Sequence, residues 1–127
     1  MSCVFCTDVN QSGEVLSEDE RSWVVRHPQG QIMIVAKRHA ENVSDLDEEE
    51  WLHLARVWHR AERRLREETK ADRVMVMKLG IQTPHLHVHI YPVRRHATRQ
   101  EVMDAIDGKV REARPADFAA RLTRRMA

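Results

Sequence analysis

Short apolar runs and one alternating stretch predict the strands of this chain. Residues 23–25, 31–36 and 73–79 are mostly apolar over the length of a strand, whereas residues 85–92 alternate histidine with branched apolar residues. The sequence His-Pro-Gln-Gly at residues 27–30 is typical of a tight turn. The first two runs are therefore expected to form a hairpin, with the second run in a central position of the sheet.

A long amphipathic helix is predicted from the capping residue Ser44 or Asp47 to about Glu68. Its first turn is acidic, which the helix dipole favours. Six apolar residues recur at helical spacing and would form one stripe across the sheet: Trp51, Leu54, Ala55, Trp58, Ala61 and Leu65. Residues 7–20, before the first predicted strand, are polar and are expected to form a loop.

Two shorter helices are expected in a C-terminal extension over residues 97–127. Thr98 and Glu101 have the spacing of a capping box for a helix over about residues 99–107, which Gly108 would end. Pro115 could open a last helix that runs through Leu122 and is buried on Phe118 and Leu122. The order β-β-α-β-β with terminal helices implies an α+β fold, and no linker divides the chain, so one domain over residues 1–127 is predicted.

Composition narrows the classes of protein to which the chain can belong. Its 127 residues are 42% hydrophobic, enough for one ordinary core. It has 21 basic and 20 acidic side chains, a net charge of +1, which argues against a dedicated nucleic-acid surface. No apolar run reaches membrane length and no charged-then-apolar leader precedes Cys3, so a cytoplasmic location without membrane contact is expected.

Three histidines in the alternating stretch form the most distinctive candidate site. His85, His87 and His89 would leave one face of a strand, at intervals of roughly 7 Å, while the residues between them enter the core. A purely structural role would be unusual for three histidines in strict register. One functional interpretation is a His-x-His zinc chelate with the third histidine behind it. The other is nucleophilic, with a neutral imidazole attacking phosphorus while its neighbours bind the oxygens.

The two cysteines, Cys3 and Cys6, have Cys-x-x-Cys spacing. A disulfide across so short a loop would constrain the unfolded chain only slightly. A thioredoxin-like redox pair would be expected between a preceding strand and a following helix. Zinc would need two further ligands from the eight histidines of the chain. Spacing alone does not decide between zinc and two idle thiols near the amino terminus.

The stretch from His85 to Pro92 resembles the signature of the histidine-triad (HIT) superfamily of nucleotide hydrolases and transferases. Two other segments are similar to the zinc-carrying branch of this superfamily: residues 3–6, and residues 34–46 with their strand, His39 and helix start. The resemblance covers about residues 3–93. It implies a HIT-like fold, in which an antiparallel sheet packs on a long central helix, and pairing of two chains as a homodimer.

The resemblance also implies roles for individual residues. A structural zinc ion would be held by Cys3, Cys6, His39 and His85. His87 would attack the α-phosphorus of a nucleotide, and His89 would bind the phosphate. The implied substrate is a nucleoside phosphoramidate, a dinucleoside polyphosphate or a similar phosphoanhydride.

Three positions depart from the pattern of the family. Gln31 stands where family members usually have a fourth histidine after glycine, and an amide cannot relay a proton. His27 and Arg26 stand near the usual ribose contact, where they are poor substitutes for a hydrogen-bond acceptor. The loop before the motif is short and leaves only Gln82 and Thr83 as side chains that could contact phosphate.

These observations support three hypotheses, of which an enzyme with His87 as nucleophile is the first. The second is a binding module that holds a nucleotide with negligible turnover. The third is a zinc-stabilised interaction protein without a small ligand.

Overall fold

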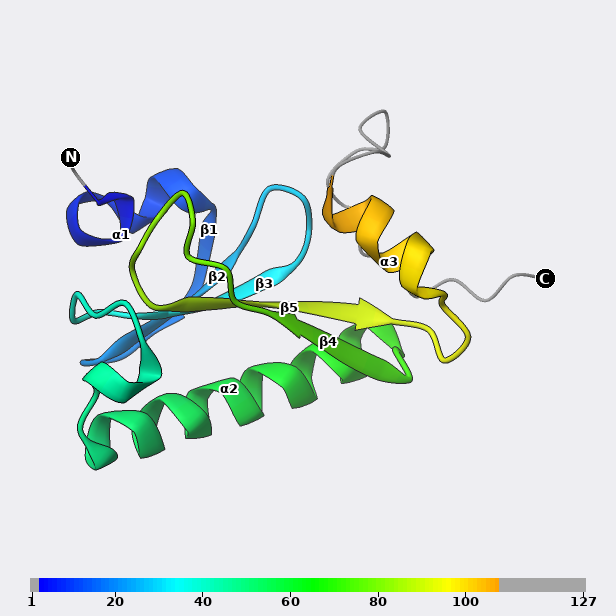
Figure 1. The fold of residues 1–127 in the computed structure, drawn as a ribbon. Coiled ribbons are helices and arrows are strands. Elements are labelled where there is room, and N and C mark those ends of the chain that lie inside the picture. Colours follow the sequence, from blue (N-terminus) through cyan, green and yellow to red (C-terminus); the bar gives the residue numbers. More distant parts are fainter. Residues whose placement is uncertain (1–2, 108–127) are drawn as a thin grey trace.

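The computed structural model describes residues 3–107, which form a five-stranded sheet with helices on both faces (Figure 1). Neighbouring strands are antiparallel throughout, in the order β1-β2-β3-β5-β4. The strands are β1 (Glu14–Glu18), β2 (Ser22–Arg26), β3 (Ile32–Ala36), β4 (Arg73–Met77) and β5 (His87–Val93). The predicted α+β fold and the predicted hairpin of β2 and β3 are confirmed.

The helices are α1 (Val4–Thr7), α2 (Glu48–Thr69) and α3 (Arg99–Ile106), with the 3-10 turns η1 (Val9–Ser12) and η2 (Val43–Asp45). Figure 1 shows the long helix α2 along one face of the sheet, whereas α1 and α3 lie over the other face. None of the helices within residues 3–107 is both long and apolar enough to span a membrane. The last predicted helix, from Pro115 through Leu122, lies outside the described residues, as does Gly108.

Helix α2 begins at Asp47, the second of the two predicted caps. The Asp47 carboxylate accepts the Glu50 amide at 2.8 Å, and the Glu50 carboxylate accepts the Asp47 amide at 3.0 Å. The helix buries Leu54, Val57 and Leu65 against the sheet, and part of Trp51, Trp58 and Ala61 packs beside them. Val57 was absent from the predicted stripe, and Ala55, which the stripe included, is only partly buried.

The prediction of a loop over residues 7–20 was wrong, because this segment contains α1's end, η1 and the edge strand β1. Strand β1 has no apolar alternation, since four of its five residues are exposed. It forms through its backbone ladder with β2, interrupted by a bulge between Val15 and Ser17. An edge strand that is exposed to solvent on both faces has no alternation of apolar and polar residues, so the sequence pattern does not predict it.

The two faces of β5 carry different side chains. Leu86, Val88 and Ile90 join the core beneath α2. The residues between them turn to the opposite face, where Val25, Met33 and Val35 form a second cluster with Phe5 of α1. Further along that face, α3 covers Tyr91 and Val93 with Val102 and Ala105. The two-residue period of the motif therefore has the predicted consequence, with apolar residues toward α2 and imidazoles on the other face.

Helix α3 has the predicted capping box. The Thr98 hydroxyl accepts the Glu101 amide at 3.1 Å, and the Glu101 carboxylate accepts the Thr98 amide at 3.3 Å. Because α3 begins within a few residues of the end of β5, it lies over the far end of the same face that carries the histidines.

Candidate functional site

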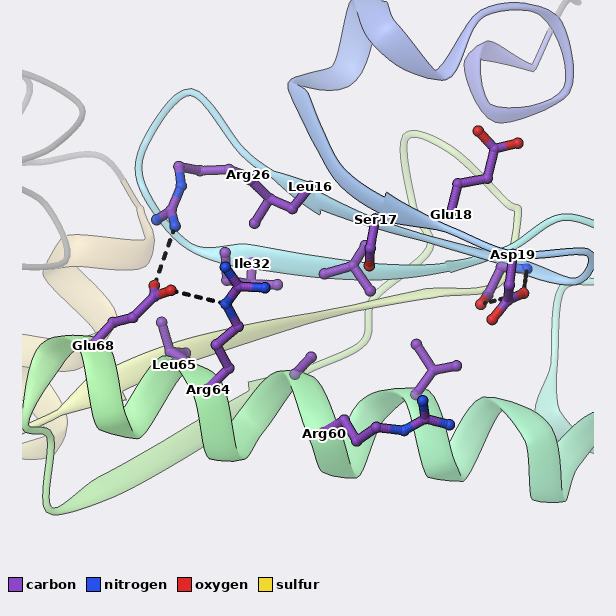
Figure 2. A pocket seen from close by; sticks show the side chains of 14 residues that line it. Leu16, Ser17, Glu18, Asp19, Arg26, Ile32, Arg60, Arg64, Leu65 and Glu68 are labelled. Atoms are coloured by element: carbon purple, nitrogen blue, oxygen red, sulfur yellow. Dashed lines mark hydrogen bonds and ion pairs between the residues drawn. The ribbon is translucent and has the colours of Figure 1, made fainter.

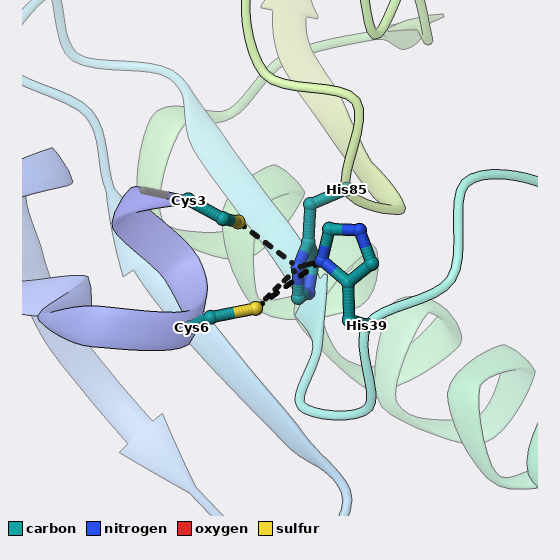
Figure 3. A group of neighbouring side chains, drawn as sticks. All are labelled: Cys3, Cys6, His39 and His85. Atoms are coloured by element: carbon teal, nitrogen blue, oxygen red, sulfur yellow. Dashed lines mark hydrogen bonds between the residues drawn. The ribbon is translucent and has the colours of Figure 1, made fainter. Parts of the chain in front are cut away.

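Four side chains converge at the amino-terminal end of the histidine motif (Figure 3). The Nδ1 atom of His85 lies 3.3 Å from the Cys3 Sγ, 3.5 Å from the Cys6 Sγ and 3.1 Å from the His39 Nδ1. The Cys6 Sγ lies 3.2 Å from the same nitrogen of His39. These four ligand atoms all lie within 4.8 Å of one another.

Three separate segments bring the four residues together. Cys3 and Cys6 stand at the start and within the single turn of α1, so both thiols point to one side. His39 lies shortly after the end of β3, and His85 lies two residues before the start of β5, the neighbour of β3 in the sheet. The His85 ring is almost wholly buried, and its Nε2–H donates to the Ala36 carbonyl at 2.5 Å. That bond leaves the lone pair on Nδ1, which faces the thiols.

The donor set fits a zinc ion. Tetrahedral zinc takes two thiolates at about 2.3 Å and two imidazoles at about 2.0–2.1 Å, so its ligand atoms are separated by distances of the kind found here. The histidine that binds zinc commonly donates its other N–H to a backbone carbonyl, as His85 does. Partial burial, together with the hydrogen bond and charge of Cys3, raises the pKa of the Cys6 thiol. Two thiolates side by side are favourable only with a cation between them. Cys3, Cys6, His39 and His85, the four predicted ligands, could therefore hold zinc.

His87 is the first of a row of imidazoles along β5. Its Nδ1–H donates to the His85 carbonyl at 2.6 Å, so the lone pair of the neutral ring is on Nε2. Burial lowers the pKa of His87, and the positive charge of Lys78 lowers it further, while the bond to His85 opposes this shift. The ring of Phe5 packs against it at 4.8 Å between centroids, and also against His85 at 5.4 Å. His87 is therefore a neutral imidazole whose Nε2 has no hydrogen-bond partner within residues 3–107.

His89 follows in the row, with its ring 5.1 Å from that of His87. The amide nitrogen of Gln31 lies 3.4 Å from the His89 Nδ1. In this orientation the amide is a donor to Nδ1, which favours the His89 tautomer with its proton on Nε2. Burial, followed by the charges of His87 and His27, lowers the pKa of His89 to about 4. Tyr91 stacks on its far side at 6.2 Å, and burial raises the pKa of that phenol to about 12.

His27 is a further imidazole in this row, although the sequence had offered it only as a poor ribose contact. The turn between β2 and β3 brings its ring 5.9 Å from that of His89, edge to face. Gly30 permits this short turn, because its φ of 106° lies where other residues are strained. The sequence signal was the His-Pro-Gln-Gly turn directly before a central strand, but only the pairing of β3 with β5 brings the turn beside the motif.

The other predicted positions lie apart from the row. Arg26 leaves the opposite face of β2 and lies 3.6 Å from Glu68 of α2, which removes it from the histidine face. Gln82 is exposed and Thr83 partly buried in the loop before β5, where the Thr83 carbonyl accepts the His85 amide at 2.8 Å. That bond anchors the start of the motif. Contact of the Gln82 and Thr83 side chains with phosphate stays a prediction.

A hollow on the α2 face provides a contrast to the histidine row (Figure 2). This cavity of about 360 Å³ lies between α2 and strands β1 and β2, with Val24, Ile32 and Leu65 in its lining. Arginines at its rim pair with Glu68, as Arg64 does at 3.0 Å. No histidine or cysteine lines it. The groups suited to nucleophilic or metal chemistry lie on the other face of the sheet.

Comparison with solved structures gives the same architecture. One match is a hypothetical histidine triad nucleotide-binding protein from Sulfolobus tokodaii strain7, with 27% identity and a TM-score of 0.64 over 75% of this chain and 71% of that one. A histidine triad protein from Bradyrhizobium japonicum matches with 23% identity and a TM-score of 0.61 over 93% and 96%. A HIT family hydrolase from Clostridium thermocellum matches with 20% identity and a TM-score of 0.58 over 77% and 96%.

No curated protein matches the chain. The model of the HIT domain matches residues 9–96, a segment that begins after the two cysteines and includes the whole histidine motif. Because this match spans more than half of the chain, the protein belongs to the HIT domain family.

Proposed function

We propose that this protein is a nucleotidyl hydrolase or transferase that uses His87 as its nucleophile. The observation that carries the proposal is the bond from the His87 Nδ1–H to the His85 carbonyl at 2.6 Å. It supports the one neutral tautomer whose Nε2 lone pair is free to attack phosphorus. The substrate is a nucleoside phosphoramidate, a dinucleoside polyphosphate or a similar phosphoanhydride.

The reaction runs in two displacements at the same phosphorus. The His87 Nε2 forms a bond to the α-phosphorus while the bond from that phosphorus to the leaving group breaks, and the bonding electron pair departs with the leaving group. A nucleotidyl-histidine results, in which the Nδ1–H of His87 still donates to the His85 carbonyl. Water or another acceptor then forms a bond to the phosphorus and loses its proton to bulk water. The bond between the phosphorus and the His87 Nε2 breaks, and its electron pair returns to that nitrogen.

His89 supports this step by donating its Nε2–H to an oxygen of the same phosphate. The Gln31 amide, 3.4 Å from the His89 Nδ1, supports that orientation of the proton. A donor aimed at developing charge in a partly dry site stabilises the transition state more than it would in water. Gln82 and Thr83, in the loop before β5, are candidates for further contacts with phosphate.

Zinc at Cys3, Cys6, His39 and His85 would be structural in this scheme. When bound, it supplies a fixed cross-link between α1, the end of β3 and the start of β5. The chain's own contribution is the position of His85, whose carbonyl holds His87 while its ring binds the Ala36 carbonyl. The metal cluster thereby supports the orientation of the nucleophile without touching the substrate.

A second candidate function is nucleotide binding with little turnover. It is favoured by Gln31, which is 2% exposed and whose Oε1 has no hydrogen-bond partner in the described part of the chain. An amide at this position cannot exchange protons with a leaving group. The binding hypothesis therefore predicts nucleotide affinity without covalent labelling.

Labelling of the protein with an α-³²P-labelled dinucleoside polyphosphate or phosphoramidate separates the two functions. The wild type is expected to give an acid-labile phosphohistidine adduct, and His87→Ala is expected to give none. His59→Ala is the matched control, because His59 is an exposed histidine of α2 on the opposite face. A wild type that binds these nucleotides but never becomes labelled would refute the nucleophile and favour the binding module.

We also infer a homodimer. Strand β4 is an edge of the sheet, and Val76 on this strand is 43% exposed, as is Leu52 on α2 at 45%. Unpaired strand edges and exposed apolar side chains are common features of subunit contacts. Sedimentation at micromolar concentration checks the inference: a clean monomer contradicts it, and Val76→Lys is expected to weaken the dimer.

A further inference from the structure

His27 has the geometry of an oriented hydrogen-bond donor at the end of the imidazole row. The Gln29 amide donates to the His27 Nδ1 at 3.0 Å, so the neutral ring carries its proton on Nε2. Within residues 3–107 no atom accepts a hydrogen bond from that Nε2–H. A purely structural role in the turn would need only the Nδ1 acceptor, which leaves the second nitrogen unexplained.

The three imidazoles of the row differ in the nitrogen that each leaves free. His87 leaves a lone pair, because its Nδ1–H is bound to the His85 carbonyl. His89 and His27 each leave an N–H, because Gln31 and the Gln29 amide donate to their Nδ1 atoms. One nucleophile is thus followed by two neutral donors, which matches a substrate with phosphorus at one end and anionic oxygens along the row.

His89 lies between the other two rings, with ring contacts at 5.1 Å to His87 and 5.9 Å to His27. The phosphate attacked by His87 would lie next to the His87 and His89 rings, within reach of both. A group bound by His27 lies one imidazole further along, beyond the phosphorus under attack. Burial and the nearby charge of His87 lower the pKa of His27, so the ring remains an uncharged donor at neutral pH.

We propose that His27 is a substrate-binding residue that donates its Nε2–H to an oxygen of the phosphate in the leaving group, and that this makes phosphoanhydrides the preferred substrates of the site. The proposal rests on the proposed function, in which His87 attacks the adjacent phosphorus. The substrate class is a dinucleoside polyphosphate or another nucleotide whose α-phosphorus is joined to a second phosphate.

The chemistry of the leaving group supports this class. Cleavage of a phosphoanhydride breaks the bond between the α-phosphorus and the bridging oxygen, and the electron pair remains on a phosphate that needs no proton at neutral pH. An amine released from a phosphoramidate must instead gain a proton, which neither the Gln31 amide nor the partly buried, uncharged ring of His27 is suited to give. A neutral N–H stabilises the departing phosphate by a hydrogen bond alone.

Two substitutions at His27 distinguish the role of its Nε2–H as a donor to substrate from the role of its Nδ1 in the turn. In His27→Asn the side-chain oxygen replaces Nδ1 as acceptor of the Gln29 amide, but the distal donor is lost. In His27→Gln the amide nitrogen reaches the position of Nε2 and restores a neutral donor. The measurement is the ratio of kcat/KM for a dinucleoside tetraphosphate to that for a nucleoside phosphoramidate, with thermal unfolding as the control for the fold.

The ratio is expected to fall about 10- to 100-fold in His27→Asn and to recover to within a few-fold of wild type in His27→Gln. An equal loss on both substrates overturns the proposal, since His27 would then act on the shared nucleotide. An unchanged ratio in His27→Asn, or failure of His27→Gln to restore it, overturns it as well.

A binding measurement keeps this test separate from the nucleophile. Titration calorimetry with a methylene-bridged dinucleoside polyphosphate should show about 10-fold weaker binding to His27→Asn than to wild type. Affinity for a nucleoside monophosphate, which lacks the leaving phosphate, should change less than threefold. This result would sustain the role of His27 even if no substrate were turned over. Equal affinities of wild type and His27→Asn for the bridged analogue would overturn that role whether or not His87 is the nucleophile.

Discussion

His85 and His87 lie two residues apart in one motif, and yet the partners of their ring nitrogens differ. His85 is 1% exposed, and both of its nitrogens face protein atoms, the Ala36 carbonyl on one side and the two thiols with His39 on the other. His87 has one nitrogen bound to a carbonyl, and its other nitrogen has no partner in the described part of the chain. The difference teaches that the partners of an imidazole, and not its place in the motif, decide whether it can act as a ligand or as a nucleophile.

The two regions are also joined. The carbonyl of His85 holds His87, and the ring of Phe5 lies against both imidazoles. Damage to the metal cluster should therefore affect stability first and activity through orientation, whereas truncation of a residue in the row should, at neutral pH, affect mainly activity. This separation can be tested from its largest expected effect to its smallest.

The largest effect is expected for His87→Ala. Loss of the proposed nucleophile should lower kcat/KM for a dinucleoside polyphosphate by on the order of 10⁴-fold or more. The free energy of unfolding should change by less than about 1 kcal/mol, because the apolar face of β5 is untouched. Steady-state kinetics and urea unfolding measure the two quantities. Near-full activity in this variant would contradict the division of roles.

The metal cluster is expected to show the reverse pattern. His85→Ala should abolish stoichiometric zinc and lower the free energy of unfolding by several kcal/mol, because a structural metal site contributes directly to folding. Elemental analysis of untagged protein should find about one zinc per wild-type chain. Chelation of the wild type should reproduce the loss of stability. Metal-free protein that melts at the same temperature with and without chelator would argue against a zinc site.

A smaller effect is expected for His89→Ala. Removal of one donor to a phosphate oxygen should lower kcat by about 10²–10³-fold while the covalent adduct still forms, since His87 remains. Quenched-flow labelling distinguishes slow formation of the adduct from its absence. Complete loss of labelling would instead give His89 a part in the attack itself.

Acid should destabilise the folded protein through His89. The pKa of His89 is lowered from 6.5 to about 4, so between these two values the unfolded chain binds more protons than the folded one. Stability is therefore expected to fall as the pH decreases through this window, with no further loss from His89 below about pH 4. Thermal melts of wild type and His89→Gln measure the effect as a difference, which removes the shared contribution of the metal ligands. Parallel curves for the two proteins would show that His89 does not titrate in this way.

The smallest effect is expected on the opposite face. Arg26→Ala removes the long ion pair with Glu68 at 3.6 Å, in which both side chains are more than one third exposed. Such pairs contribute about 0–1 kcal/mol, and the cavity they border contains none of the site's imidazoles. The expected result is unchanged kcat/KM and a shift of the melting temperature of a few degrees at most. A large loss of activity would connect the α2 face to the site.

Local pattern was sufficient for several parts of this structure. The alternation in β5, the capping boxes of α2 and α3, and the hairpin of β2 and β3 follow from residues close together in sequence. Strand β1 does not follow from local sequence, because its polar residues show no alternation and its backbone hydrogen bonds depend on β2. The cluster of Cys3, Cys6, His39 and His85, which could hold zinc, was predicted by resemblance to a family. The spacing of Cys3 and Cys6 alone left idle thiols as an equal alternative.

The sequence by itself determined the chemical types present and the face of β5 on which the histidines lie, because side-chain direction in a strand follows from a period of two. Only the tertiary structure decided which nitrogen of each imidazole is free. For two of the imidazoles that choice depends on groups from other segments, Ala36 for His85 and Gln31 for His89. His87 and His27 instead bond to backbone groups two residues away. The tertiary structure also decided the place of His27, since the pairing of β3 with β5 carries its turn to the end of the row. Hydrogen-bond partners distant in sequence leave no local pattern, and so the orientations of His85 and His89 could be read only from the folded chain.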